Sequence, residues 1–334
     1  MRRLFFLLML LAGVVLLALI LVRPVEEYRA ETWALWPESQ GPPATFTVDE
    51  NGRVVVVPRS GDRFYKLSPS RGRWQEVTLK TADGFSPWVA HLTSDGAGGF
   101  FAVDQGGSLL WRIGPDGTTL LYFQAPSQGE KWLIQGVAVD PKGQAFLDMV
   151  RLLPQAYARE IVRLEENPKE FTVVARVLLD EEGWHLEGES QEAPPGTLSL
   201  SPTGQIFFLD PKESDMSLSI RVLAPGKKPG TIRVDSLDRL GRVEVVGNDD
   251  RGYVYIGLNL GSQDGSILKV SPEGKAIWAL PLPMAPDHPA LQRYAQVDGR
   301  GNLYVMRPGE GGFEIRFYRL VKRYAWRWME RTGS

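Results

Sequence analysis

The stretch that decides the fold runs from Ser94 to Phe123 and reads SDGAGGFFAVDQGGSLLWRIGPDGTTLLYF. It contains three short apolar runs, at 100–103, 109–113 and 118–123, separated by turn residues rich in Gly, Asp and Pro. Short runs of β-branched and aromatic residues between such turns predict β-strands joined by tight turns. Three strands cannot bury a sheet face alone, so we expect copies of this unit elsewhere in the chain.

The unit recurs six times as the pattern apolar-x-apolar-Asp-x-x-Gly followed by an apolar run, with Ser201 replacing the aspartate in the fourth copy. The glycines of the pattern are spaced by 46, 45, 61, 48 and 49 residues. A period in the forties with about four strands is typical of propeller blades. The sequence therefore predicts an all-β, six-bladed β-propeller over about 44–330. The six glycines are Gly52, Gly98, Gly143, Gly204, Gly252 and Gly301.

Each part of the repeat has an expected physical role. The aspartate is expected to bond the backbone of its own turn, and the glycine supplies a positive φ. The run after each glycine, such as Val54-Val55-Val56, is apolar throughout, which predicts a strand buried between neighbouring blades on both faces. Later in most copies one basic residue alternates with apolar residues, which predicts a third strand with one face in solvent. These basic residues are Lys66, Arg112, Arg163, Arg221 and Lys269.

The alternation VxxDxxGxxYVxD … RIxxFxPDG that these copies follow resembles NHL-repeat six-bladed β-propellers and, more distantly, the gluconolactonase and strictosidine-synthase-like propellers. The resemblance covers about 44–320, although the Asn-Asn pair usual after the second NHL strand is missing from every copy. It implies an architecture more than an activity, because this scaffold hosts binding proteins and enzymes alike.

A gluconolactonase-like site would require a Glu from an early blade, with Asn and Asp residues around the channel holding one divalent cation. Gln40 occupies the position where the resemblance would place the Glu, immediately before Gly41-Pro42. Asn248 and Asp249 fall at a turn that we expect on the opposite face of the ring. No metal ligand and no catalytic residue is therefore predicted, and a divalent cation is the one candidate cofactor.

The amino terminus carries an apolar stretch, Leu4 to Val22, of nineteen uncharged residues. As a helix rising ~1.5 Å per residue it approaches the ~30 Å hydrocarbon thickness of a bilayer, which predicts a transmembrane anchor. A cleaved signal peptide is the alternative, but its apolar region usually spans about 7–15 residues and no Ala-x-Ala-like site follows here. Arg2 and Arg3 favour a cytoplasmic segment at 1–3, and thus a single-pass protein of the cell membrane with an extracytoplasmic propeller.

Two segments compete to close the predicted ring. Within the expected linker at 23–43, Thr32 to Trp36 resembles the fourth strand expected at 276–281. The stretch from Tyr324 to Met329 alternates aromatic with other residues and also fits a strand, with an aromatic-basic tail near the membrane as its rival interpretation. The sequence leaves both segments open.

Bulk composition excludes several classes of function. A formal net charge of −2 gives no basic field, so nucleic acid is not an expected partner. The chain has no cysteine, which excludes disulfides, thiolate catalysis and Cys-based metal sites. Only three histidines are present, and no nucleophile elbow, P-loop, His-Glu-x-x-His motif or EF-hand loop occurs.

Candidate site residues fall into two groups. Four lie where the first strands begin, at the expected channel mouth, and fit a planar or sugar-like ligand, although packing between blades is the alternative role. Four others lie in two long segments of the third blade, 148–160 and 179–196, which we expect to be partner-binding loops or else variable surface insertions. The channel-mouth residues are Trp88, Trp132, Arg242 and Tyr294, and the loop residues are Arg151, Tyr157, Trp184 and His185.

The sequence thus favours a membrane-anchored, extracytoplasmic propeller that acts as a binding or scaffolding module for a protein or an envelope component. The alternative is a metal-dependent, lactonase-like hydrolase on the same scaffold. We expect the binding module rather than an enzyme, because no catalytic constellation is recognisable in the sequence.

Overall fold

The chain is almost entirely β-structure in a computed structural model. The residues described are 9, 22–67, 73–81, 88–126, 131–140, 142–152, 157–165, 170–178, 198–200, 205–209, 217–223, 230–235, 243–258, 265–282, 294–309 and 312–326. The chain divides into two compact units, one formed by Met1–Glu31 with Tyr318–Ser334 and the other by Thr32–Phe317.

None of the described residues forms a helix long and apolar enough to cross a membrane. Of the apolar stretch at 4–22, only Met9, which is helical, and Val22 are described. The predicted transmembrane segment therefore falls outside the described residues and stays a prediction.

The described strands form six sheets, five of which are built from consecutive chain segments. Sheet one contains β2 (Pro43–Val48), β3 (Val54–Pro58), β4 (Arg63–Leu67) and β5 (Trp74–Thr78), after a short 3-10 helix η1 (Glu38–Gln40). Sheet two contains β7 (Val89–Ser94), β8 (Phe100–Asp104), β9 (Leu109–Ile113) and β10 (Thr118–Gln124), with β6 (Lys80–Thr81) parallel to β10 at its outer edge. Sheet three contains β11 (Lys131–Val139), β12 (Ala145–Leu152), β13 (Tyr157–Leu164) and β14 (Phe171–Leu178).

The remaining three sheets complete the described structure. Sheet four contains β15 (Leu198–Leu200), β16 (Ile206–Leu209), β17 (Ser217–Leu223) and β18 (Gly230–Asp235). Sheet five contains β19 (Val243–Asn248), β20 (Val254–Leu258), β21 (Ser266–Val270) and β22 (Ala276–Pro281). Sheet six joins both ends of the chain, in the order β23 (Ala295–Val297), β24 (Leu303–Gly309), β25 (Gly312–Trp326) and β1 (Val22–Trp36).

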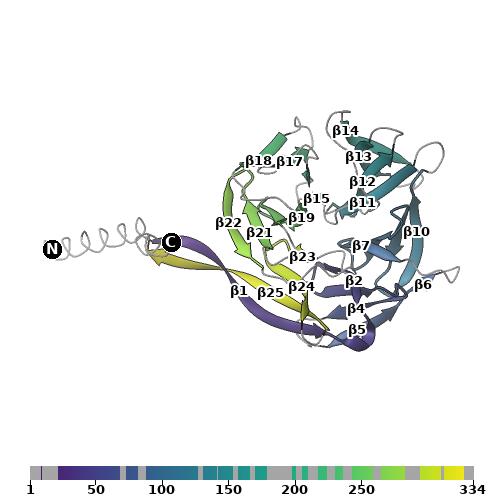
Figure 1. Cartoon of the computed structure of the whole chain (residues 1–334), viewed down its shortest axis with the longest axis horizontal. Helices are drawn as coiled ribbons and strands as arrows, with labels where there is room; N and C mark the ends of the chain where they lie inside the picture. Colours follow the sequence, from purple (N-terminus) through teal and green to yellow (C-terminus); the bar gives the residue numbers. More distant parts are fainter. Residues whose placement is uncertain are drawn as a thin grey trace. The chain divides into compact units, whose positions relative to one another are not determined.

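The first strands of the sheets surround a common centre (Figure 1). Strands β2, β7, β11, β15, β19 and β23 contact one another in this order, and β23 contacts β2 again. The side-chain amide of Gln296 on β23 donates to the carbonyl of Phe46 on β2 across 3.4 Å at this junction. The prediction of an all-β propeller is confirmed.

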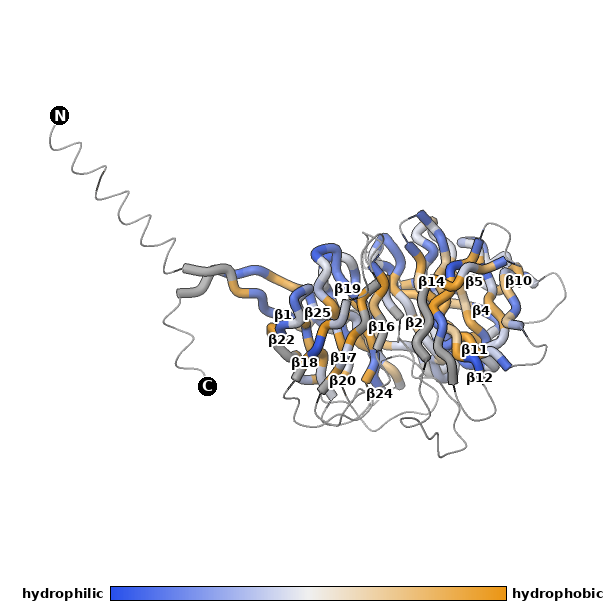
Figure 2. Tube along the Cα trace, turned by 90° about the horizontal axis from the view of Figure 1, so that it is seen from above, coloured by the Kyte–Doolittle hydropathy of each residue, from blue (hydrophilic) through white to orange (hydrophobic). Residues whose placement is uncertain are grey.

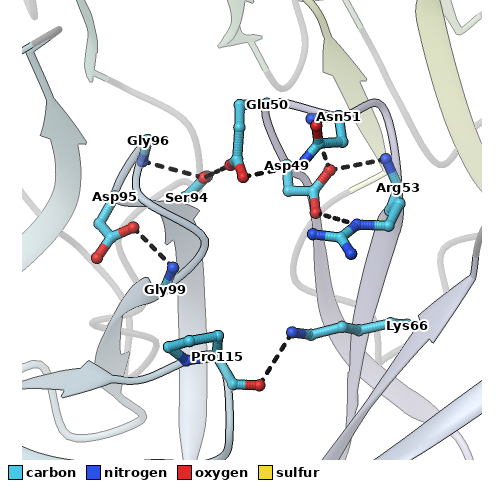
Figure 3. A network of polar contacts seen from close by, with 10 residues as sticks. All are labelled: Asp49, Glu50, Asn51, Arg53, Lys66, Ser94, Asp95, Gly96, Gly99 and Pro115. Carbon is cyan, nitrogen blue, oxygen red and sulfur yellow. Dashed lines mark hydrogen bonds and ion pairs between the residues drawn. The ribbon is translucent and has the colours of Figure 1, made fainter.

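The aspartate turns are built as the repeat predicts. Asp49 Oδ1 accepts the amides of Asn51 and Arg53, at 2.9 Å each, and Gly52 has a φ of 71° (Figure 3). A positive φ is open to Gly without strain, which explains the residue type at this position. The same pair of bonds, to the amides two and four residues on, recurs at Asp95, Asp140, Asp249 and Asp298.

The core lies between the sheets, where apolar strand centres meet (Figure 2). Val55 on β3, Phe64 on β4 and Leu92 on β7 belong to one cluster that joins sheets one and two, and each is at most 1% exposed. Similar clusters join sheets two and three, and sheets four and five. The second strands are therefore buried on both faces, as predicted, and burying one large apolar side chain contributes roughly 1.5–3 kcal/mol.

The expected solvent face of the third strand is wrong for its two lysines. Lys66 on β4 and Lys269 on β21 are 7% and 0% exposed, whereas Arg112 on β9 is exposed. The Lys66 ammonium lies 5.1 Å from the ring centroid of Phe64 and donates to the carbonyl of Pro115 at 3.2 Å. On β4 and β21 the lysine ammonium therefore lies against aromatic faces rather than in water. Burial lowers the pKa of Lys66 below its usual value.

The outermost strand of sheet six is β1, so Thr32–Trp36 takes the position for which two segments competed. The stretch Tyr324–Trp326 is a strand, as predicted, but it continues β25 and is not a separate fourth strand. Trp36 is 1% exposed, and its Nε1 donates to the carbonyl of Gly41 at 2.6 Å. Residues 327–329 lie outside the described part of the chain.

The predicted loop at 148–160 is also wrong. Strands β12 and β13 pair from Phe146 with Arg163 to Leu152 with Tyr157, so only 153–156 connect them. The stretch is expected to be a loop because it follows the second strand of a blade with an unusually long repeat, but the consecutive side chains of Asp148 and Met149 are both fully buried. The insertion lengthens a hairpin instead of adding a loop.

Candidate functional site

The centre of the ring is lined by the six first strands, which carry few charges. Within their described residues, Glu244 on β19 is the only carboxylate and His91 on β7 is the only histidine. Glu244 is 1% exposed, while His91 is half-buried. An ionisable group buried on a strand beside a central channel is a candidate for function, because burial of charge is costly.

Strand alternation sets the direction of Glu244. Its neighbours Val243 and Val245 pack in the core cluster that joins sheets four and five, together with Phe207 and Ile220. Because side chains alternate along a strand, Glu244 projects from the opposite face of β19. Strand β19 also contacts β23 of sheet six. The cross-strand partner of Glu244 on β20 is Gly257, which has no side chain to occupy the space beside the carboxylate.

The other polar side chains described on these strands are mostly neutral. Thr45 and Thr47 on β2 and Gln296 on β23 are buried, at 0%, 3% and 8% exposure. On the neighbouring strands β15 and β19, the hydroxyl of Ser199 donates to the side-chain oxygen of Asn248. The described first strands therefore carry one carboxylate, while their other buried polar side chains are hydroxyls and amides.

The four channel-mouth residues have different environments. Trp88, directly before β7, is 63% exposed, and its carbonyl accepts the amide of Gln105 at 2.6 Å. Trp132 on β11 is half-buried, while Tyr294, directly before β23, is 0% exposed. Arg242 lies outside the described residues. A shared ligand-binding role for the four stays a prediction.

The structure brings together two residues that the sequence had assigned to different groups. Trp132 and Arg151 are cross-strand partners on β11 and β12, and the Arg151 guanidinium lies 5.5 Å from the Trp132 ring centroid. The Phe171 ring also packs edge-on against Trp132, at 6.5 Å between ring centroids. The sequence places Arg151 in a loop. A loop residue has no strand register, so its cross-strand partner cannot be predicted.

The other loop residues contribute little that can be described. Tyr157 is the first residue of β13, not a loop residue. Trp184 and His185 lie outside the described residues, as does the acidic segment around them. Their proposed partner-binding role is therefore untested.

The described residues do not supply a gluconolactonase-like cation site. They contain no group of three or more His, Asp or Glu side chains that could hold a metal ion. Gln40 accepts a hydrogen bond from the Tyr65 hydroxyl in sheet one. Asp249 bonds its own turn and the Arg251 guanidinium, at 2.9 Å. Both side chains are thus engaged in structural contacts.

Comparisons with known proteins identify the fold and no family. No protein-family model and no curated protein matches the sequence. Among solved structures, the calcium-binding protein regucalcin from Agrobacterium tumefaciens is 13% identical with a TM-score of 0.55, over 86% of this chain and 93% of its own. A gluconolactonase from Xanthomonas campestris is 14% identical with a TM-score of 0.55, over 88% of this chain and 90% of its own. A streptogramin B lyase is 14% identical with a TM-score of 0.54, over 88% and 98% of the two chains. At these identities the similarity shows the β-propeller fold alone.

Proposed function

We propose that this chain is a six-bladed, NHL-like propeller enzyme that hydrolyses a small lactone at the centre of its ring. The observation that carries the proposal is Glu244, a carboxylate 1% exposed on a first strand whose other described polar side chains are neutral. The similar folds of a gluconolactonase and a calcium-binding propeller support this class of activity over pure scaffolding.

The proposed chemistry needs one general base. The Glu244 carboxylate takes a proton from a water molecule while the water oxygen attacks the lactone carbonyl carbon. The ring C–O bond then breaks, and the leaving alkoxide receives the proton from the Glu244 carboxyl group. The product is a hydroxy acid, and the carboxylate is regenerated. Hydroxyl and amide groups such as Thr47 and Gln296 would orient the polar substrate.

A divalent cation is the cofactor that a gluconolactonase-like propeller would use. The described residues contain no group of carboxylates and histidines that would hold one. We therefore assign no step to a metal. Whether turnover requires a cation is measured by chelation and by metal addition.

The test is turnover of a panel of sugar lactones by the purified full chain, with EDTA or with added Ca²⁺ or Zn²⁺. Glu244→Gln keeps the side-chain volume but removes the base, so we expect turnover to fall by about 10²–10⁴-fold. Glu76→Gln, on the outer strand β5, is the matched control and should keep full activity. Wild-type protein inactive under every metal condition, or a fully active Glu244→Gln variant, would refute the proposal.

A binding module is the second candidate, and exposed Trp88 favours it. A tryptophan with 63% of its surface in solvent, held at the start of a first strand, is the residue type enriched in binding hot spots. A photo-crosslinker at position 88 should then capture a protein or envelope component from intact cells. No capture at position 88, together with lactone turnover, would leave the enzyme as the function.

We also propose that the apolar stretch at 4–22 anchors the chain in the cell membrane with the propeller on the extracytoplasmic side. Its length, Arg2 and Arg3 support this placement. Carbonate extraction should leave the full chain in the membrane fraction, and protease added to intact cells should digest the propeller. Release by carbonate would contradict the anchor.

A further inference from the structure

Several first strands contain a β-bulge, a residue that the pairing with the second strand skips, and sheet five carries its bulge at a different position. In sheets one, two and three the skipped residue lies five positions before the turn aspartate. The skipped residues there are Ala44, Ala90 and Gln135. In sheet five the skipped residue is Val246, three positions before Asp249. The bulge of β19 is therefore two residues closer to its turn.

The position of the bulge decides which residue of β19 is paired. Between the two possible bulge positions the strand is displaced by one residue, which reverses the face of each side chain. The structure pairs Glu244 with Gly257 and Val245 with Ile256. With the bulge where sheets one to three have it, Val245 would lie opposite Gly257 and Val246 opposite Ile256. Glu244 would then be the skipped residue.

The position that Glu244 occupies belongs to one layer of the ring. In each sheet this layer contains the residue opposite the fifth residue after the repeat glycine, and its members in sheets one to three are Thr45, His91 and Gly136. The partners of Thr45 and His91 are Val57 and Val103, which belong to core clusters shared with the following sheet. Directly opposite residues share a face, so this layer points toward the following sheet. The moved bulge thus puts a carboxylate where Val245 would otherwise stand.

The moved bulge requires a glycine at position 247. Gly247 has a φ of 155°, and a Cβ atom there would lie 2.5 Å from Cγ1 of Val297 on β23. The equivalent residues of sheets one to three carry side chains, and they are Thr47, Thr93 and Ala138. A side chain therefore fits this position only with the bulge in its common place. The core favours neither register, because a valine lies opposite Ile256 in both.

We propose that Gly247 is a positioning residue for the Glu244 carboxylate. It permits the bulge at Val246, whereas a side chain at 247 returns the bulge to its common place and exchanges Glu244 for Val245 in the layer. This inference rests on the role of Glu244 as the base of the proposed reaction. The position of the bulge is measured without any turnover, so the two claims fail separately.

Engineered disulfides measure the register, because the chain has no cysteine. Opposite Cα atoms of an antiparallel pair lie about 4.5–5.5 Å apart, which a disulfide spans. Glu244→Cys with Gly257→Cys should cross-link on oxidation, whereas Val245→Cys with Gly257→Cys should not. Adding Gly247→Thr should reverse the two results. The control is Val297→Ala, which shortens the other side of the same contact and should keep the wild-type pattern.

Turnover of a sugar lactone connects the register to activity. Gly247→Thr should lower turnover about 10²–10⁴-fold, the loss expected of Glu244→Gln. Adding Val245→Glu to Gly247→Thr should restore most of it, because the returned bulge places residue 245 opposite Gly257. Val245→Glu alone should not help, since Val245 packs in the core cluster of sheets four and five. A merely structural role of Gly247 predicts no such rescue.

A cross-link between 244 and 257 that persists in Gly247→Thr would overturn the positioning role, whatever the turnover. Reversed cross-links with unchanged turnover would show that the reaction does not need Glu244 in the layer, which also overturns it. Reversed cross-links in a chain that hydrolyses no lactone would refute the hydrolysis and leave the control of register by Gly247 intact. Should Gly247→Thr not fold, Gly247→Ala adds the Cβ atom alone and should give the same reversal.

Discussion

Asp249 shows how many hydrogen bonds and ion pairs one turn aspartate can make. It is 0% exposed, and it accepts the amides of Arg251 and Tyr253 at 3.0 and 3.1 Å and the Tyr255 hydroxyl at 3.1 Å. The Arg251 guanidinium supplies the opposite charge at 2.9 Å. Burying this carboxylate is tolerable only because every bond is present at once.

Asp249→Ala is therefore expected to lower the free energy of unfolding by roughly 2–4 kcal/mol, since it leaves buried donors without an acceptor. Urea unfolding followed by tryptophan fluorescence measures this loss. Asp116→Ala is the matched control, because Asp116 bonds the Thr118 amide and hydroxyl in an exposed turn. A loss at Asp249 no larger than at Asp116 would contradict the role of the buried turn.

Tyr304 gives the chain a defined response to alkaline pH. Burial, and next the neighbouring Asp298 carboxylate, raise the pKa of the Tyr304 hydroxyl well above its usual value of 10.0. Below pH 10 this tyrosine is protonated in both folded and unfolded chains, so it contributes no pH dependence there. Above pH 10 the unfolded chain loses the proton while the folded chain keeps it, so stability falls as pH rises.

Tyr304→Phe should therefore flatten the loss of melting temperature as the pH rises above about 10, relative to wild type. At neutral pH it should cost about 1–2 kcal/mol, because the 3.2 Å bond to Asp298 is removed. Thermal melts of both proteins across this range measure the difference. Parallel curves for the two proteins would show that Tyr304 does not control the alkaline limb.

At the scale of single elements, the end of β1 is attached by one aromatic cluster. The Trp36 ring meets Tyr65 and Trp74 edge-on, with centroids at 5.2 and 5.1 Å. Trp74 Nε1 in turn donates to the carbonyl of Leu35 at 3.1 Å. These contacts join β1 to β4 and β5 of sheet one.

Trp36→Ala is expected to lower the free energy of unfolding by roughly 3–5 kcal/mol, the cost of removing a fully buried aromatic ring. Trp88→Ala removes an equally large ring that is 63% exposed, so its loss should stay below about 0.5 kcal/mol. Equilibrium unfolding in urea compares the two. A similar loss for both variants would mean that the cluster does not hold β1.

Features that depend on neighbouring residues in the sequence were predictable. Features that depend on contacts with another sheet were not. The aspartate turns were recognisable because the Asp-x-x-Gly spacing sets both the bonds and the positive φ. The burial of Lys66 was not, since its partner Pro115 lies 49 residues away in another sheet. The 148–160 hairpin is not predictable from composition, because its charged residues lie opposite apolar residues of the partner strand, such as Glu160 opposite Met149.

At the scale of the whole molecule, the six copies predicted the ring, but not the strand that completes it. Thr32–Trp36 resembles an expected fourth strand and Tyr324–Met329 alternates like one, so the hydrogen-bond order β23-β24-β25-β1 was needed to choose. The candidate site was also predictable only in part. A first strand could be recognised from the repeat, yet Glu244 became a candidate only once its burial and its direction were known.

The larger unit, Thr32–Phe317, contains all six first strands and the Trp36 cluster, so we expect it to fold alone. A fragment of 32–317 should keep a cooperative melt close to that of the full chain. A fragment of 38–317 lacks the outer strand of sheet six, which exposes the β25 edge, and removes Trp36 from its pocket. Its melting temperature should fall by at least as much as in Trp36→Ala. Equal melting of the two fragments would show that the ring is complete without β1, and an unfolded 32–317 would show that the smaller unit is needed as well.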